Sequence, residues 1–144
     1  MKQIVYLLVF IFISTALAKP DSDKILGVWL VEDKDAKVEI YKKNNKFYGK
    51  IIWLKEPKEN GKPKLDKNNP NEKLQTRPLI GLLILKDFVY TDDLEWEDGE
   101  IYDPGNGKTY GCNMELEDYN TLEVRGYIGI SLFGRTDVWT RTKK

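Results

Sequence analysis

Apolar and polar residues alternate with a period of two over most of the chain, the pattern of half-buried β-strands. Near the C-terminus, Leu122 and Val124 alternate with charged residues, and a second run contains Val138 and Trp139. No stretch carries a convincing amphipathic helix pattern. The alternation predicts about eight short strands, of which the clearest lie at 27–32, 36–42, 47–54, 100–102, 108–116 and in two runs within 121–141.

Turn signals separate these strands at regular intervals, as in all-β barrels and sandwiches. Asn44 and Asn45 predict a tight turn between two strands, because Asn tolerates the left-handed backbone of such turns. Asp98-Gly99 predicts a second hairpin turn, after an apolar segment at 88–96. The glycine-rich stretch 105–109 includes a Gly-Lys-Thr sequence, but a strand follows it, so it predicts a turn and not a phosphate-binding loop.

The final strand needs a partner, and the obvious unpaired one is the first strand, at 27–31. Pairing the two closes the sheet and removes its exposed edges. The sequence therefore predicts an all-β fold, a single antiparallel up-and-down barrel of about eight strands.

Two segments depart from the alternating pattern. Residues 55–75 form a long polar connection with three prolines, which predicts either a solvated excursion or a functional loop. Residues 79–85 are the most hydrophobic part of the chain after the N-terminal segment, and we interpret them as a buried strand, with one helical turn before the strand as the alternative.

The N-terminal segment has the features of a signal peptide. Lys2 is followed by an apolar run over 4–13, and Ala16-Leu17-Ala18 has the small-residue pattern of a cleavage site. We expect cleavage after Ala18, so that residues 1–18 are removed and 19–144 form a single β-barrel domain in the periplasm or outside the cell. No later apolar run approaches the roughly 20 residues that a membrane-spanning helix needs.

Charge and cysteine content narrow the function further. The chain has 23 basic and 23 acidic residues, and loss of Lys2 with the signal peptide leaves a net charge of −1. Such a balance provides no attraction to nucleic acid, so we expect no nucleic-acid partner.

Cys112 is the only cysteine and cannot form an internal disulfide; its place in a predicted strand favours burial.

The absence of histidine removes the usual catalytic and metal-binding arrangements. An enzyme would depend on other side chains, such as Asp103, Tyr102 or Tyr110, and we predict no catalytic residues and no cofactor. Asp66 and the asparagines that follow it could attract a cation, but their spacing is typical of side-chain-capped turns, so no metal site is predicted.

Aromatic residues and arginines occur on nearly every predicted strand and supply the candidate ligand contacts. In a closed barrel, inward rings either fill the core or line a pocket for one small ligand. Arg135, Asp137, Trp139 and Arg141 share one face of the last strand, and that face matters only if it points inward. The candidate ligand-binding residues are Tyr41, Trp53, Tyr102, Tyr110, Arg125, Tyr127, Arg135 and Trp139.

Several ordered motifs over 27–141 resemble a family of small secreted bacterial proteins of uncharacterised function. The motifs are Gly27-Val28-Trp29, Asn69-Pro70-Asn71, Pro78-Leu79 with Gly81, Ile101-Tyr102-Asp103-Pro104, Gly107-Lys108-Thr109-Tyr110, Val124-Arg125-Gly126-Tyr127, and Gly134-Arg135-Thr136 with Trp139. The resemblance implies a lipocalin-like barrel and a periplasmic or secreted location. In the wider lipocalin resemblance, Trp29 packs beneath a late arginine, Arg135 or Arg141, to close the barrel base; we favour Arg141.

Together these observations favour a non-enzymatic exported protein that holds an apolar or amphipathic small molecule, such as a lipid or fatty acid. The alternative is an interaction module of the cell envelope with a filled barrel, in which the surface or the loop at 55–75 contacts a partner. No pattern predicts an oligomeric state.

Overall fold

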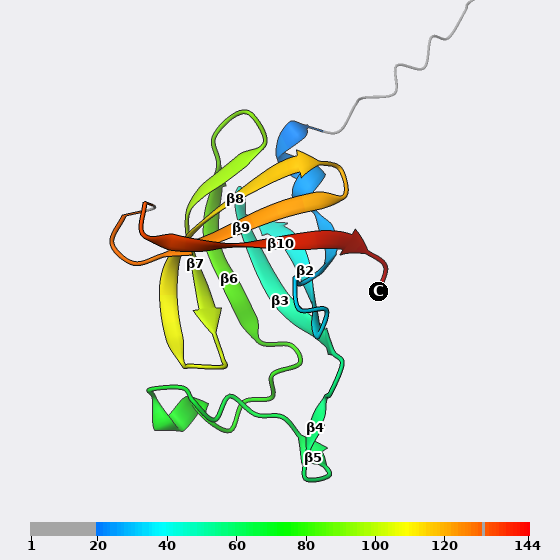
Figure 1. Cartoon of the computed structure of the whole chain (residues 1–144), viewed down its shortest axis with the longest axis vertical. Coiled ribbons are helices and arrows are strands. Elements are labelled where there is room, and N and C mark those ends of the chain that lie inside the picture. Colours follow the sequence, from blue (N-terminus) through cyan, green and yellow to red (C-terminus); the bar gives the residue numbers. More distant parts are fainter. Residues whose placement is uncertain (1–19, 131) are drawn as a thin grey trace, which may run out of the picture.

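The computed structural model describes residues 20–130 and 132–144, and the predicted signal peptide lies outside these residues. Eight antiparallel strands form a closed barrel (Figure 1). They are β1 (Gly27–Leu30), β2 (Ala36–Lys43), β3 (Lys46–Leu54), β6 (Leu83–Tyr90), β7 (Glu95–Asp103), β8 (Lys108–Asp118), β9 (Thr121–Tyr127) and β10 (Gly134–Thr142). Within the described part of the chain, no helix is long and apolar enough to cross a membrane.

The barrel closes through its two terminal strands. The strand order is β1-β10-β9-β8-β7-β6-β3-β2, and β2 pairs again with β1. In the closing ladder, Trp29 of β1 lies opposite Arg141 of β10. The predicted pairing of the first and last strands is confirmed.

The two predicted hairpin turns have different outcomes. Asn44 and Asn45, with φ of 51° and 62°, form the tight turn between β2 and β3, as predicted. Asp98-Gly99 is not a turn, because it lies within β7, where Asp98 has a φ of 59° and the ladder to β8 shifts register. The Phe88 ring occupies the space where a side chain at position 99 would lie, so only glycine allows the ring to pack against this strand. The chain reverses earlier, between β6 and β7.

One end of the barrel is closed by a short 3₁₀ helix, η1 (Asp21–Ile25), and by the largest core side chains. Trp29 and Ile25 are fully buried, and the Trp29 indole N–H donates to the Ile25 carbonyl at 2.9 Å. Other fully buried rings of this core are Phe47, Phe88 and Trp96. Burial of such side chains stabilises the fold by roughly 1.5–3 kcal/mol each.

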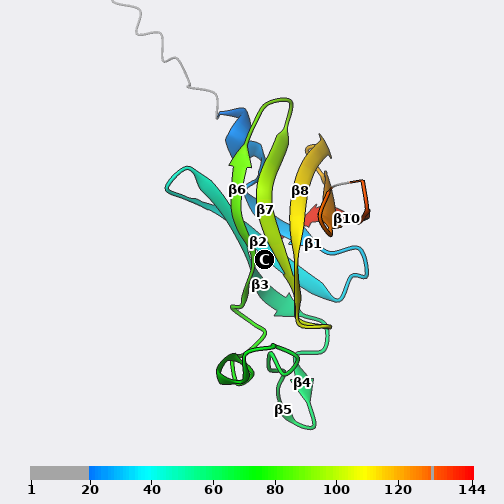
Figure 2. The same ribbon diagram turned by 90° about the vertical axis from the view of Figure 1, so that its left-hand side faces the viewer.

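The long connection lies at the opposite end, as two perpendicular views show (Figures 1 and 2). It contains a small hairpin of β4 (Lys58–Glu59) and β5 (Lys62–Pro63) and a second 3₁₀ helix, η2 (Glu72–Leu74). Residues 79–82 continue it, with a turn in which the Leu82 N–H donates to the Leu79 carbonyl at 3.1 Å. The strand of this segment therefore begins only at Leu83, and a turn precedes it, as in the alternative that the sequence left open.

Candidate functional site

The barrel contains a cavity of about 980 Å³ on the side away from η1. Its inner wall is apolar and comes from strands all around the barrel, with Val38, Ile51, Ile84, Ile101, Val124 and Trp139. Turns between strands form its mouth, and Lys55, Lys64 and Leu79 of the long connection border it. An eight-stranded barrel is wide enough to hold one small ligand, so the wall and the mouth together form a candidate binding site.

The register of β10 decides which of its side chains reach this cavity. Trp139 is 3% exposed, whereas its neighbour Val138 is 38% exposed, so the odd-numbered residues face inward. Arg135, Asp137 and Trp139 consequently line the cavity from one strand. The shared face of the last strand therefore points inward.

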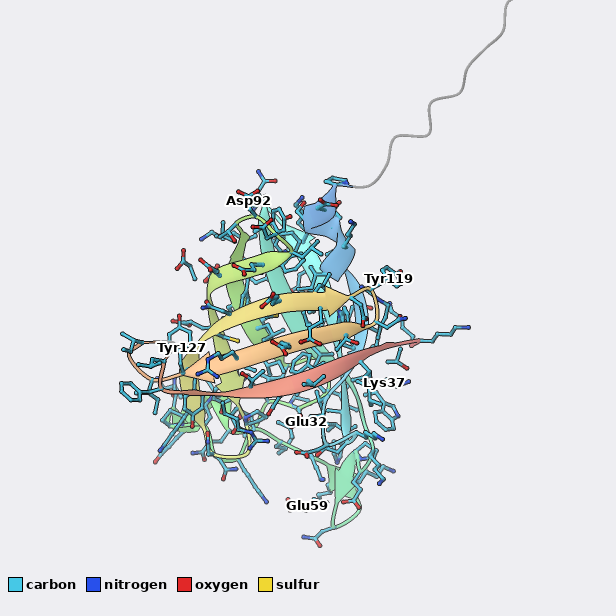
Figure 3. All side chains as sticks on the ribbon, turned by 45° about the horizontal axis from the view of Figure 1, so that its top comes forward. Glu32, Lys37, Glu59, Asp92, Tyr119 and Tyr127 are labelled. Atoms are coloured by element: carbon cyan, nitrogen blue, oxygen red, sulfur yellow. The ribbon has the colours of Figure 1, made fainter. Side chains whose placement is uncertain are left out.

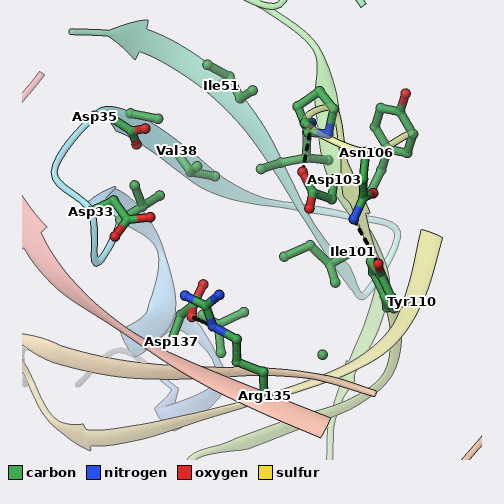
Figure 4. A pocket seen from close by; sticks show the side chains of 18 of the residues that line it. Asp33, Asp35, Val38, Ile51, Ile101, Asp103, Asn106, Tyr110, Arg135 and Asp137 are labelled. Carbon is green, nitrogen blue, oxygen red and sulfur yellow. Dashed lines mark hydrogen bonds and ion pairs between the residues drawn. The ribbon is translucent and has the colours of Figure 1, made fainter. Parts of the chain in front are cut away.

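Polar groups concentrate at the mouth (Figure 4). The Arg135 Nε lies 2.9 Å from Asp137 Oδ1, and its Nη2 lies 3.8 Å from a carboxylate oxygen of Glu32. Burial raises the pKa of the Asp137 carboxyl; the Arg135 guanidinium opposes this rise, and the charges of Glu32 and Asp33 add to it. The mouth thus holds a half-buried carboxylate beside a guanidinium that is already paired.

The β7–β8 turn forms another side of the mouth. The Asp103 Oδ1 accepts a hydrogen bond from the Gly105 N–H at 2.8 Å, and Asn106 Nδ2 donates to the Tyr110 hydroxyl at 2.9 Å. These bonds hold the turn in shape. The glycine-rich stretch 105–109 is a strand connection, as predicted, and not a phosphate loop.

Five of the eight predicted ligand contacts border the cavity, and their roles differ. Tyr110, Arg135 and Trp139 line it from β8 and β10. Tyr127 lies at the rim, but its ring crosses the outer side of Gly111 on the neighbouring strand. Tyr102 borders the cavity while its hydroxyl points to the long connection.

The other three predicted contacts lie on the outer face of the barrel and do not border the cavity. Tyr41 stacks on Tyr48 with ring centroids 5.8 Å apart, and Trp53 is 38% exposed beneath the Lys37 ammonium. Arg125 donates to the Thr136 hydroxyl and to the Leu132 carbonyl. Alternation places each of them opposite an inward neighbour, and an aromatic or basic side chain does not itself reveal which face is the inner one.

Trp29 and Arg141 meet at the closed end. The Arg141 guanidinium lies between two rings, 4.3 Å from the Trp29 centroid and 4.1 Å from that of Tyr119. It also donates to three backbone carbonyls, those of Lys24, Leu26 and Tyr119, at 2.5–2.8 Å. Figure 3 shows Tyr119, in the turn before β9, and Tyr127, the last residue of β9, on opposite sides of the barrel. Arg141 therefore lies at the base of the barrel, while Arg135 lies at the mouth.

A buried polar cluster fastens the long connection to the barrel, and sequence reasoning did not identify it. Asp66 is fully buried and accepts hydrogen bonds from the Tyr102 hydroxyl at 2.5 Å, Arg77 Nη2 at 2.7 Å and Asn69 Nδ2 at 2.9 Å. Burial would raise the Asp66 pKa, but these donors outweigh it and hold the pKa below its usual value. The sequence offered only separate signals: the oxygen-rich run that begins at Asp66, and the family motifs that contain Asn69 and Tyr102 and begin just after Arg77.

The hydrogen bonds of this cluster bear on two chemical roles considered above, catalysis by Tyr102 and metal binding by the asparagine-rich loop. Burial and the Asp66 carboxylate raise the pKa of Tyr102 to about 12. Near neutral pH the phenol therefore stays protonated, and its hydroxyl donates to Asp66. Asn69 and Asn71 accept backbone hydrogen bonds two residues ahead, as in the predicted side-chain-capped turns. Among residues 20–130 and 132–144, no three Asp, Glu or Cys side chains are placed to hold a metal ion.

Cys112 is fully buried on β8, as the sequence favoured. Burial, with a smaller contribution from the Asp137 charge, raises the pKa of its thiol to about 12. A thiol that is neither ionised nor accessible is unreactive. Cys112 is therefore a packing residue of the hydrophobic core.

Comparisons with known proteins agree with this geometry. Residues 27–141 match the model of a family described as "Uncharacterized protein conserved in bacteria (DUF2147)". A solved structure described as "Protein HP1028 from the human pathogen Helicobacter pylori belongs to the lipocalin family" is similar, with a TM-score of 0.75 and 26% identity, covering 83% of this chain and 84% of that chain. No curated protein matches the chain. The predicted lipocalin-like barrel is confirmed, and such barrels typically bind small molecules and are not typically catalysts.

Proposed function

The chain belongs to the DUF2147 family of uncharacterised bacterial proteins, and from this premise and the cavity of the closed barrel we propose that it binds an amphipathic small molecule of lipid type. One observation carries the proposal: a cavity of about 980 Å³ with an apolar inner wall and a polar mouth. Apolar surface removed from water stabilises binding by roughly 25 cal/mol per Å². The apolar part of the ligand lies within the barrel and its polar end lies at the mouth.

The mouth itself is amphipathic, which supports this orientation. Ile128 and Phe133, from the β9–β10 connection, line the cavity and are 72% and 69% exposed. Asp33, Asp35 and Asp103 supply carboxylates to the same mouth. An apolar chain can contact the two apolar side chains while its polar end stays near the carboxylates.

We propose further that the protein acts after export, in the periplasm or outside the cell. Lys2, the apolar run over 4–13 and Ala16-Leu17-Ala18 support cleavage after Ala18. Cell fractionation, with the N-terminus of the recovered protein determined by mass spectrometry, tests this. An N-terminus at Lys19 in the periplasm or medium is expected, and an uncleaved protein in the cytoplasm would contradict it.

Binding is tested by native mass spectrometry of the protein from bacterial cells and by titration with the fluorescent apolar probe 1-N-phenylnaphthylamine. We expect an additional mass that disappears on delipidation and saturable probe binding by the delipidated protein. A protein that carries no additional mass and takes up no probe would refute the proposal.

A variant that fills part of the cavity tests whether the probe binds there. A Cβ added at Gly126 meets only Ile101 and Tyr110, at 3.5 and 3.8 Å, so Gly126→Leu fits locally and projects into the cavity. It should weaken probe binding at least about tenfold by occupying the ligand's space. Val138→Leu, on the outer face of β10, is the matched control and should bind the probe normally.

The alternative function, an interaction module, is favoured by one observation. Ile128, Ile130, Leu132 and Phe133 are each 58–74% exposed on a single connection, and such apolar exposure typically marks an interaction site. If contact with another protein is the function, Ile130→Ser with Leu132→Ser should abolish partner capture and leave probe binding unchanged.

A further inference from the structure

The mouth of the cavity is a negative region on a protein that is otherwise balanced in charge. Five carboxylates border the cavity, those of Asp33, Asp35, Glu56, Asp103 and Asp137, against three cationic side chains. The whole chain, by contrast, has equal numbers of acidic and basic residues. Figure 4 shows Asp33 and Asp35 on one side of the opening and Asp103 on another. A polar group at the opening therefore meets carboxylates from more than one direction.

Two of the three cations at the mouth are already paired. Lys64 Nζ lies 3.8 Å from a carboxylate oxygen of Glu56. Arg135 contacts both Asp137 and Glu32. Lys55 is the remaining cation of the lining.

Three carboxylates are left without such partners. Within the described part of the chain, no ion pair involves Asp33, Asp35 or Asp103. The charges of the lining that form no ion pair are thus three carboxylates against the single Lys55 ammonium. This excess attracts a cation to the mouth and repels the anionic end of a fatty acid.

The inner wall of β10 independently indicates that a ligand belongs in the cavity. Trp139 is 97% buried against the lining, and its indole N–H has no hydrogen-bond partner among the described residues. Two residues along the same face, Asp137 Oδ1 is shielded from water and has only its ion pair with Arg135. Buried polar atoms normally have hydrogen-bond partners, so a ligand that brings an acceptor atom to the indole N–H, in addition to its polar end at the mouth, suits this wall.

We propose that the ligand of this cavity carries a positively charged polar end, an amine or a quaternary ammonium, and not a carboxylate. Asp33, Asp35 and Asp103 set this preference at the mouth. The inference rests on the proposed function and specifies the ligand class that the same cavity accepts.

Three ligands with the same ten-carbon chain separate this inference from the proposed function: decylamine, decanol and decanoate. At pH 7 their polar ends are cationic, neutral and anionic. Each competes with 1-N-phenylnaphthylamine for the delipidated protein at low ionic strength. We expect decylamine to bind most tightly and decanoate most weakly, with about a tenfold or larger difference between these two that shrinks in 1 M salt.

Removal of the mouth charges tests the residues themselves. The variant D33N/D35N/D103N keeps the shape of each side chain, and the amide oxygen that it places at position 103 can still accept the hydrogen bond from the Gly105 N–H. The difference between decylamine and decanoate should fall at least about threefold, with decanol affinity unchanged.

The matched control, D92N/E97Q/E115Q, makes the same change in charge on side chains outside the cavity lining. Figure 3 shows Asp92 at the far end of the barrel from Glu59. This control should keep the preference of the unmodified protein. Equal affinities for the three ligands, or tightest binding of decanoate, would overturn the inference and leave the proposed function standing. Failure of all three ligands to displace the probe, or of the probe itself to bind, would count against both.

Discussion

Substitution of Asp66 by alanine should detach the long connection from the barrel. The carboxylate is fully buried and accepts hydrogen bonds from Tyr102, Asn69 and Arg77. Asp66→Ala leaves the buried Tyr102 hydroxyl and the buried Asn69 amide without an acceptor, at a cost of about 1–3 kcal/mol each. Arg77 is 40% exposed and can be hydrated, so its loss adds at most about 1 kcal/mol. These terms sum to about 2–7 kcal/mol, a span that includes the roughly 3–5 kcal/mol typical of breaking a buried charge pair.

Hydrogen exchange followed by mass spectrometry resolves where this free energy is lost. The Asp66 N–H donates to the Arg77 carbonyl, and the Leu79 N–H donates to the Lys64 carbonyl, so these amides report on the docked connection. Their exchange should accelerate about 10²- to 10³-fold, while amides of the barrel strands change little. Lys67→Ala is the control, because Lys67 is an exposed residue of the same connection that forms only a surface ion pair.

The pH dependence provides a second check on the same reasoning. A lowered pKa means that the Asp66 carboxylate contributes stability above its unfolded value of 3.8 and loses that contribution as the pH falls below it. The unmodified protein and Asp66→Ala should therefore converge in stability at acid pH. An effect below about 1 kcal/mol at pH 7, or a difference that persists undiminished at pH 2, would refute the assigned role.

Three further predictions concern other parts of the fold. Arg141→Lys should lower the free energy of unfolding in urea by about 2–3 kcal/mol, because an ammonium cannot both stack on Trp29 and reach three carbonyls; an unchanged urea midpoint would contradict this. Gly107→Ala should release the long connection in hydrogen exchange, since a Cβ there would overlap the Asn68 carbonyl and φ is 72°; normal protection would show that the contact is dispensable. Tyr102 has a raised pKa of about 12, so its contribution to stability is complete below pH 10 and is lost towards pH 12; Tyr102→Phe should flatten the alkaline part of the stability curve, and an identical slope would exclude this.

Hairpin geometry shows how far local patterns predicted the fold. Asn44-Asn45 forms the expected turn, because two residues in the left-handed region match the twist of the strands on either side. Asp98-Gly99 has equally strong turn chemistry, yet it forms a bulge within β7. The difference arises from the Phe88 ring, which needs the open space above Gly99 and comes from another strand.

The candidate site was predicted only in part, for a related reason. Alternation groups Arg135 with Trp139, but the same pattern cannot distinguish the cavity wall from the outer surface, where Tyr41 and Trp53 lie. The cluster around Asp66 unites residues up to 36 positions apart, and its burial depends on how the long connection folds back.

By itself, the sequence determined the all-β class, the closure of the barrel by its first and last strands, and a connection too polar to belong to the core. The class and the polar connection follow from a local pattern with a period of two. The closure follows from the general need to pair strand edges, which the first and last strands satisfy by pairing with each other. Tertiary structure alone decided which side chains face the cavity, which carboxylates gather at its mouth, and that the connection is fastened by Asp66. These depend on the register and on contacts between distant residues, where one position of shift moves a side chain from the ligand site to the solvent.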